Sequence, residues 1–212
     1  MSEVIEFLFG QYRDYKVSHI LLEVVAIIAS IISVIYSFKN KIWVFPFGIL
    51  STLIFVYLLL QWNLLGDMLI NAYYFIMSVY GWYIWTRKID ATHETPITIT
   101  SDKEWIHSFL LLLSTAVGVY VLYFVTNRLE SIVSYIDMLT TGIFFAGMWL
   151  MARRKLEHWL VLMVGNVISV PLYFYKGYSF SALLYLFLAI IAYYGYLEWK
   201  KYLNKQPILG KE

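Results

Sequence analysis

The chain has 212 residues, of which 61% are hydrophobic and only 14% are charged. Soluble domains are typically about half apolar and about a quarter charged, so this composition indicates a membrane protein. The net charge of +2 gives no reason to expect a nucleic-acid partner. Because cysteine is absent, disulfides, zinc–thiolate sites, iron–sulfur clusters and cysteine nucleophiles are excluded.

Seven apolar segments are each long enough to cross the hydrocarbon core, which takes roughly 20 residues of helix. They are 20–38, 42–61, 67–86, 105–126, 131–152, 157–175 and 179–199. Barrel strands alternate and are much shorter, so these runs predict an all-α integral membrane protein forming a single domain, 1–212. The one long connection, 87–104, is polar and is expected to be an aqueous loop.

Basic residues gather at one end of the predicted helices. Twelve lie at one end and four at the other. The twelve are Lys39, Lys41, Arg87, Lys88, Lys103, Arg153, Arg154, Lys155, Lys200, Lys201, Lys205 and Lys211, and the four are Arg13, Lys16, Arg128 and Lys176. Lysine and arginine favour the cytoplasmic side, so we expect an outside N-terminus and a cytoplasmic C-terminus.

A faint internal repeat accompanies this topology. Residues 80–87 and 194–201 both read Tyr-Gly-aromatic-x-x-Trp-x-basic, 114 positions apart, and Trp43 and Trp159 follow basic clusters 116 positions apart. Interfacial aromatic and basic residues also recur at any cytoplasmic helix end, which is the alternative interpretation. The matching offsets favour two parallel three-helix repeats, 20–86 and 131–199, joined by a linker helix, 105–126. Parallel repeats are one known transporter plan, with the substrate between the halves.

Polar side chains within spans are the candidates for function, because they are expensive in the hydrocarbon core. Asn166 lies near the middle of the sixth span, and Trp159 and Leu162 are spaced to share its helical face. An amide offers donors and an acceptor to a ribose or a carboxamide. The alternative is that Asn166 hydrogen-bonds a neighbouring helix and only stabilises packing.

Other candidates lie in the third and fifth spans. Asn71 lies one turn into the third span, and the same alternative of helix packing applies to it. Asp137, with Thr141 one turn further along, could balance a cationic ligand or pair with another span. Tyr73 is one of several aromatic residues within spans that could stack on a flat heterocycle.

Signatures of catalysis are missing from the sequence. There is no phosphate-binding glycine loop, no G-x-S-x-G and no HExxH. His19, His93, His107 and His158 lie at span ends or in loops without metal-ligand spacing. We therefore expect neither an enzyme nor a metal site or cofactor.

Two stretches resemble the nicotinamide riboside transporter family, PnuC, and its vitamin-transporting relatives. Residues 65–73 followed by 80–85 are similar to the family's L-x-G-D-x-x-[LI]-Q-x-x-[YF] and Y-G-W-x-x-W. Residues 157–166 are similar to its E-x-W-x-x-W-x-x-x-N. Asn71 stands where the family usually has glutamine, and Leu162 replaces the second tryptophan of the motif.

The resemblance implies a SWEET-like three-plus-one-plus-three fold in the inner (cytoplasmic) membrane, with substrate bound midway between the repeats. It also implies facilitated diffusion of an unphosphorylated vitamin nucleoside, later trapped by a cytoplasmic kinase, and a homotrimer. Trp159 and Asn166 match substrate-binding positions of the family.

Three functions follow as hypotheses. The first is facilitated uptake of nicotinamide riboside, and the second is transport of thiamine, another cationic heterocycle carried by relatives. The third, from a different class, is a membrane scaffold or accessory subunit that transports nothing. Substituting Asn166 separates the classes, because a scaffold would lose stability or assembly and a transporter would lose flux.

Overall fold

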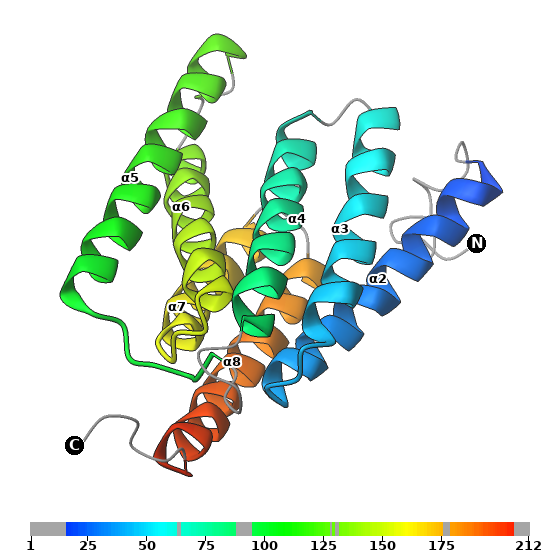
Figure 1. Cartoon of the computed structure of the whole chain (residues 1–212). Coiled ribbons are helices and arrows are strands. Elements are labelled where there is room, and N and C mark those ends of the chain that lie inside the picture. The colour runs from blue at the N-terminus through cyan, green and yellow to red at the C-terminus, as the bar shows by residue number, and fades with distance from the viewer. Residues whose placement is uncertain are drawn as a thin grey trace. The chain divides into compact units, whose positions relative to one another are not determined.

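A computed structural model of the chain describes residues 16–62, 65–87, 95–127, 129, 132–175 and 179–205. Within these ranges the chain forms seven α-helices (Figure 1). They are α2 (Val17–Phe38), α3 (Val44–Gln61), α4 (Leu65–Thr86), α5 (Asp102–Val125), α6 (Ile132–Ala152), α7 (His158–Tyr175) and α8 (Ser179–Lys205).

Each predicted span corresponds to one of these helices. The bounds differ by at most three residues, except that α8 continues to Lys205. Among the described residues, six helices are long and apolar enough to cross a membrane: α2, α3, α5, α6, α7 and, from Ala182, α8. The chain is therefore an all-α, multi-pass membrane protein.

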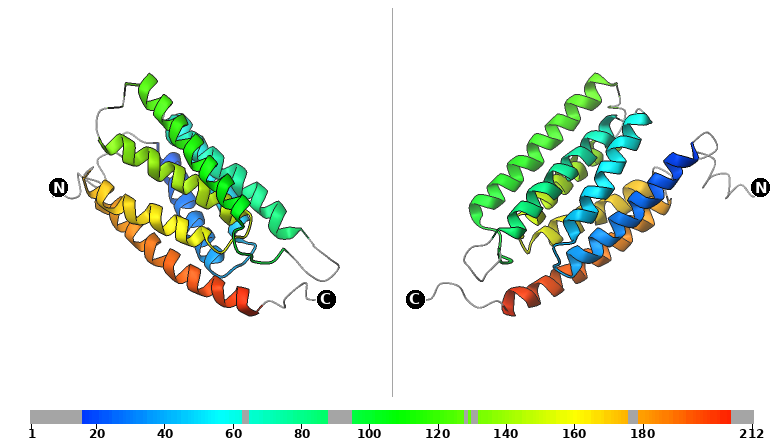
Figure 2. Two further views of the ribbon diagram at one scale, coloured as in Figure 1. Left: turned by 90° about the vertical axis from the view of Figure 1, so that its left-hand side faces the viewer. Right: turned by 45° about the vertical axis from the view of Figure 1, so that its right-hand side comes forward.

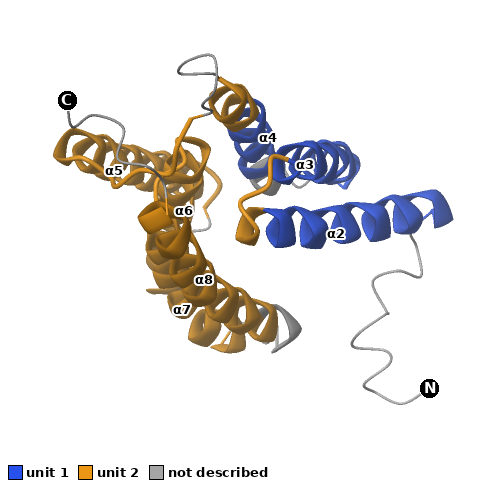
Figure 3. Ribbon diagram, turned by 60° about the horizontal axis from the view of Figure 1, so that its bottom comes forward, with its two compact units in different colours: residues 1–36, 43–79 blue, residues 37–42, 80–212 orange. Residues whose placement is uncertain are grey.

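Two compact units divide the chain (Figure 3). The first comprises Met1–Tyr36 and Trp43–Val79, and so holds most of α2 and α4 and all of α3. Within it, the Ser51 hydroxyl donates to the Ala26 carbonyl at 2.8 Å and the Ser33 hydroxyl donates to the Val44 carbonyl at 2.7 Å. A Cβ on Gly48 would lie 3.2 Å from the Ser33 Oγ. Small residues thus bring these helices close together, as is usual in membranes.

The second unit comprises Ser37–Ile42 and Tyr80–Glu212. In it α6 packs against both α5 and α7, and α7 packs against α8, as the views of Figure 2 also show. Three glycines allow these approaches. A Cβ on Gly142 would lie 2.7 Å from the Leu112 carbonyl oxygen, one on Gly147 2.6 Å from the Leu162 Cδ2, and one on Gly165 2.8 Å from the Phe144 ring.

The helix bounds repeat along the chain with a single spacing. Four bounds recur 114 positions later: Phe38 and Ala152, Val44 and His158, Gln61 and Tyr175, and Leu65 and Ser179. The turns after α2 and α6 match as well, since Asn40 and Arg154 both have a positive φ, of 51° and 58°. With this spacing Phe45 is the equivalent of Trp159, whereas the sequence suggested Trp43 as its equivalent. Burial agrees, since Phe45 is 2% and Trp159 4% exposed, whereas Trp43 is 56% exposed.

The connection between α4 and α5 differs from the expected aqueous loop. Residues 88–94 lie outside the described part, but 95–101 pack against the turn between α6 and α7. The Leu156 amide donates to the Thr98 carbonyl at 3.0 Å, and the side chain of Ile97 is only 1% exposed. The Glu157 carboxylate accepts from both the amide and the hydroxyl of Thr100, at 2.8 and 2.6 Å. The polar composition of the connection did not predict these contacts of residues 95–101 with the turn between α6 and α7.

Candidate functional site

The candidates in α7 lie in the second unit and contact two different neighbouring helices. Trp159 packs against α8, where a Cβ on Gly195 would come within 2.7 Å of its ring. Leu162 instead packs against α6 at Gly147. The expected shared face of Trp159, Leu162 and Asn166 therefore does not lie against one common partner.

Two polar side chains of α7 lie in the protein interior. The Asn166 side chain is 6% exposed. The Trp159 indole nitrogen is buried without a partner among the described residues. Leaving a buried donor unpaired typically costs about 1–3 kcal/mol, so an unpaired indole N–H beside a buried amide on one helix is unusual.

The candidates in α6 are Asp137 and Thr141, both half-buried. The Thr141 hydroxyl donates to the Asp137 backbone carbonyl at 2.8 Å, so its proton is used within the helix. The hydroxyl oxygen can still accept a bond. Thr141 can thus accept a hydrogen bond from a ligand, but its own hydroxyl proton is already donated.

Asn71 and Tyr73 lie in the part of α4 that belongs to the first unit, and both side chains are half-buried. The Tyr73 ring lies 6.1 Å from the Tyr74 ring, centroid to centroid. The other five candidates lie in the second unit.

A buried tryptophan pair at the lysine-rich end of the second unit was not predicted as a site. Trp85 and Trp199 are 1% and 0% exposed, and their ring centroids are 5.5 Å apart. The Trp85 indole N–H donates to the Met151 carbonyl at 3.3 Å. The Trp199 indole N–H donates to the Ser37 carbonyl at 2.9 Å. The motif that contains these tryptophans was recognised in the sequence, but only as a sign of a repeat and, for residues 80–85, of the family resemblance.

Arg154 lies beside this pair and is only 8% exposed. Its Nη2 donates to the Asn40 side-chain oxygen at 3.0 Å, its Nη1 donates to the Thr95 carbonyl, and its Cζ lies 4.5 Å from the centre of the Trp85 ring. A desolvated guanidinium over a tryptophan face is stabilised by about 2 kcal/mol. In the sequence Arg154 counted only as one of several basic residues marking the cytoplasmic side.

His158 begins α7 and is fully buried. Its Nδ1 lies 2.6 Å from the Lys155 carbonyl, which can only accept, so the proton is on Nδ1 and Nε2 is an acceptor. Within the described residues Nε2 has no partner. The imidazole packs against the Trp159 ring at 4.6 Å and the Trp199 ring at 4.7 Å, so it helps to hold both indoles in place.

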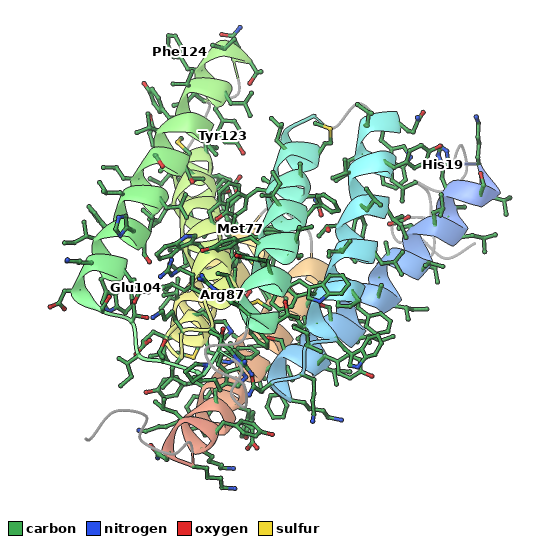
Figure 4. The ribbon with its side chains drawn as sticks, viewed as in Figure 1. His19, Met77, Arg87, Glu104, Tyr123 and Phe124 are labelled. Carbon is green, nitrogen blue, oxygen red and sulfur yellow. The ribbon has the colours of Figure 1, made fainter. Side chains whose placement is uncertain are left out.

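An ion cluster fixes the start of α5 beside this site (Glu104 is labelled in Figure 4). The Glu104 carboxylate accepts from the Ser101 backbone amide at 3.0 Å, which caps the helix. It also pairs with Arg153 at 3.0 Å and Lys155 at 2.8 Å. Helix α5 is thereby held to the turn between α6 and α7, which positions Arg154 and His158.

Closely packed apolar helices with buried polar groups and a strongly basic end define a multi-pass α-helical membrane protein. Comparison with known proteins identifies which one. A family model described as "Nicotinamide mononucleotide transporter" matches residues 20–201, and the chain belongs to this family. It is a transporter and not an enzyme, and a multi-pass protein of the cell membrane, the inner one in bacteria.

Similar proteins include two kinds of vitamin carrier. The riboflavin/roseoflavin transporter RibM of Streptomyces davaonensis is 24% identical over 193 residues, covering 88% of this chain and 89% of RibM. The nicotinamide riboside transporter PnuC of Escherichia coli K12 is 24% identical over 206 residues, covering 84% of each chain. The crystal structure of a vitamin B3 transporter PnuC shares the fold, with a TM-score of 0.63, 22% identity and coverage of 97% of this chain and 89% of that one.

Proposed function

We propose that this protein facilitates uptake of nicotinamide riboside. The substrate moves down its gradient by alternating access between two three-helix repeats, and a cytoplasmic kinase traps it by phosphorylation. The observation that carries the proposal is the indole N–H of Trp159, which is buried without a partner among the described residues, together with the buried Asn166 side chain on the same helix. These groups supply the donors and the acceptor that the hydroxyl groups or the carboxamide of a ligand need.

The charges of the candidate residues support a nucleoside over a nucleotide. The seven candidates, which are Asn71, Tyr73, Asp137, Thr141, Trp159, Leu162 and Asn166, include one carboxylate and no lysine or arginine. A phosphate buried among them would lack a cation and would face the Asp137 charge. A positively charged ring, by contrast, is attracted by both aromatic faces and a carboxylate.

The common spacing of 114 between helix bounds supports the proposed repeats, 20–86 and 131–199, with 105–126 as the linker. We place the lysine-rich end in the cytoplasm and the N-terminus outside, on the distribution of basic residues. The proposal includes a homo-oligomer, with a trimer expected from the family resemblance. Asn71 and Tyr73 are the candidates that the first repeat contributes.

Two other vitamins are the alternative substrates. The first is riboflavin, which RibM carries. The second is thiamine, which is a cationic heterocycle like nicotinamide riboside. The shorter Asn71 and the loss of a second tryptophan at Leu162 change the shape that a ring must fit, which is the observation that favours testing them.

Binding to purified protein tests the proposal. We would titrate nicotinamide riboside, its mononucleotide, riboflavin and thiamine by calorimetry, and then measure uptake of the one that binds in proteoliposomes. Asn166→Ala should weaken binding about 10- to 30-fold, because about two hydrogen bonds of roughly 1 kcal/mol each are lost.

Ser169→Ala is the matched control, since Ser169 is also buried on α7 but its hydroxyl donates to the Gly165 carbonyl of its own helix at 2.8 Å. It should bind as the parent does. Unchanged affinity in Asn166→Ala, with altered stability or assembly, would instead favour the scaffold hypothesis.

A further inference from the structure

The buried tryptophans at the lysine-rich end form two hydrogen bonds that cross between segments far apart in the chain. Trp85, at the end of α4, bonds to Met151, at the end of α6. Trp199, in the last part of α8, bonds to Ser37, at the end of α2. Each bond therefore ties the third helix of one proposed repeat to the first helix of the other.

The two bonds are equivalents of one another. Trp199 lies 114 positions after Trp85, and Met151 lies 114 positions after Ser37, which is the spacing of the helix bounds. Each proposed repeat thus donates one indole N–H to the other and accepts one from it. Equivalent repeats form the same contact twice in this crossed manner, so the two bonds mark the place where the proposed repeats are joined at this end.

The side chains of the two left-handed turns contact each other beside these tryptophans. Asn40 and Arg154 are also 114 positions apart, and the Arg154 guanidinium binds the Asn40 oxygen through both Nε, at 3.3 Å, and Nη2, at 3.0 Å. The turn ending α2 is thereby fixed to the turn ending α6. The positive φ of Arg154 is unfavourable for a residue with a Cβ, so the conformation depends on these contacts being made.

We propose that Trp85, Trp199, Arg154 and Asn40 form the cytoplasmic gate of the transporter, which the structure captures closed. Release of substrate requires the two indole hydrogen bonds to break and the Asn40–Arg154 contact to part. The inference rests on the proposed alternation between the repeats but not on the identity of the vitamin.

The chain has no cysteine, so a single introduced cysteine can report opening and no native cysteine has to be replaced first. Ser37→Cys places the thiol at a 4% exposed position of the gate while keeping the backbone carbonyl that Trp199 binds. Thr100→Cys is the control thiol. It lies at the same lysine-rich end and is 6% exposed, but it contacts Glu157 and not the gate.

Labelling with a membrane-impermeant maleimide is measured in inside-out vesicles and in right-side-out vesicles. Trp85→Phe and Trp199→Phe each keep a ring and remove one N–H. Each should raise the labelling rate of Cys at 37 about fivefold, because one hydrogen bond of average strength is lost per substitution. The double variant should label faster than either single variant, but the two effects are not expected to multiply because the rings are in contact. Trp82→Phe, on the same helix as Trp85 but 42% exposed, should leave the rate unchanged.

Labelling from the cytoplasmic face alone, raised by the two gate substitutions and unaffected at position 100, supports the gate. An unchanged rate at position 37, an equal rise at position 100 or labelling only from the outside face overturns it. Because the assay needs no substrate, these outcomes are independent of the calorimetry. A protein that binds none of the four vitamins can still show a working gate.

Discussion

Replacing Gly195 by alanine tests whether the position of the Trp159 ring matters for binding. Gly195 lies in α8 where the indole of Trp159 crosses it, and a Cβ there would come within 2.7 Å of two ring atoms. Ordinary van der Waals contact begins near 3.4 Å. The ring must therefore move by about 0.7 Å, or α7 and α8 must separate by a similar amount, because a packed interior has little free space.

The expected magnitude combines two opposed effects. Overpacking of a buried contact costs about 1–3 kcal/mol. Alanine in place of glycine in a helix returns about 1 kcal/mol. We therefore expect a net destabilisation of about 0–2 kcal/mol. If Trp159 donates its indole N–H to the substrate, its displacement should also weaken binding about tenfold.

The assays are calorimetric titration of the substrate and thermal unfolding in detergent. Gly118→Ala is the control, because a Cβ at Gly118 in α5 meets nothing within 4 Å. This variant should bind normally and be slightly more stable than the parent. Equal affinity and stability in Gly195→Ala and the parent would refute the placement of the Trp159 ring and the role assigned to it.

Two further predictions concern the turn before α7. His158→Asn can keep a donor near Nδ1 for the Lys155 carbonyl, whereas His158→Gln cannot, so thermal unfolding should show the Gln variant less stable by about 1–2 kcal/mol. Equal stability of the two variants would mean that the Nδ1 bond contributes nothing. Glu157→Gln removes the charge that binds both Thr100 donors and should lower stability by about 1–2 kcal/mol, with substrate affinity unchanged in calorimetry. A loss of affinity without a loss of stability would instead place Glu157 in the substrate site.

The number and bounds of the helices were predictable because hydrocarbon thickness sets the length of an apolar run. The segments 42–61 and 157–175, for example, match α3 and α7 to within two residues at each end. The end of α8 was missed, since helical hydrogen bonding continues to Lys205 beyond the last apolar residues. Hydropathy marks where a helix leaves the membrane and not where the helix ends.

The environment of individual polar residues could not be predicted in the same way. Arg154 is flanked by Arg153 and Lys155, and composition cannot distinguish the one that is buried on the Trp85 ring from two that pair with Glu104. The difference comes from the left-handed turn at Arg154, which redirects a single side chain. Family resemblance named Trp159 and Asn166 as candidates, but the burial of both side chains and the unpaired indole nitrogen of Trp159 are visible only in three dimensions.

The glycine contacts within each unit have a consequence for how the two halves diverged. Gly48 in α3 faces Ser33 in α2, and 114 positions later Leu162 in α7 faces Gly147 in α6. At both contacts of the proposed repeats the larger side chain on one helix lies against a glycine on its partner, so we expect a larger residue on one helix to require a smaller one on the other. Such compensated exchanges preserve the spacing of helices while erasing identity between duplicated segments. A duplication can thus be detected from matching helix bounds even when the residues at the packed contacts no longer resemble one another.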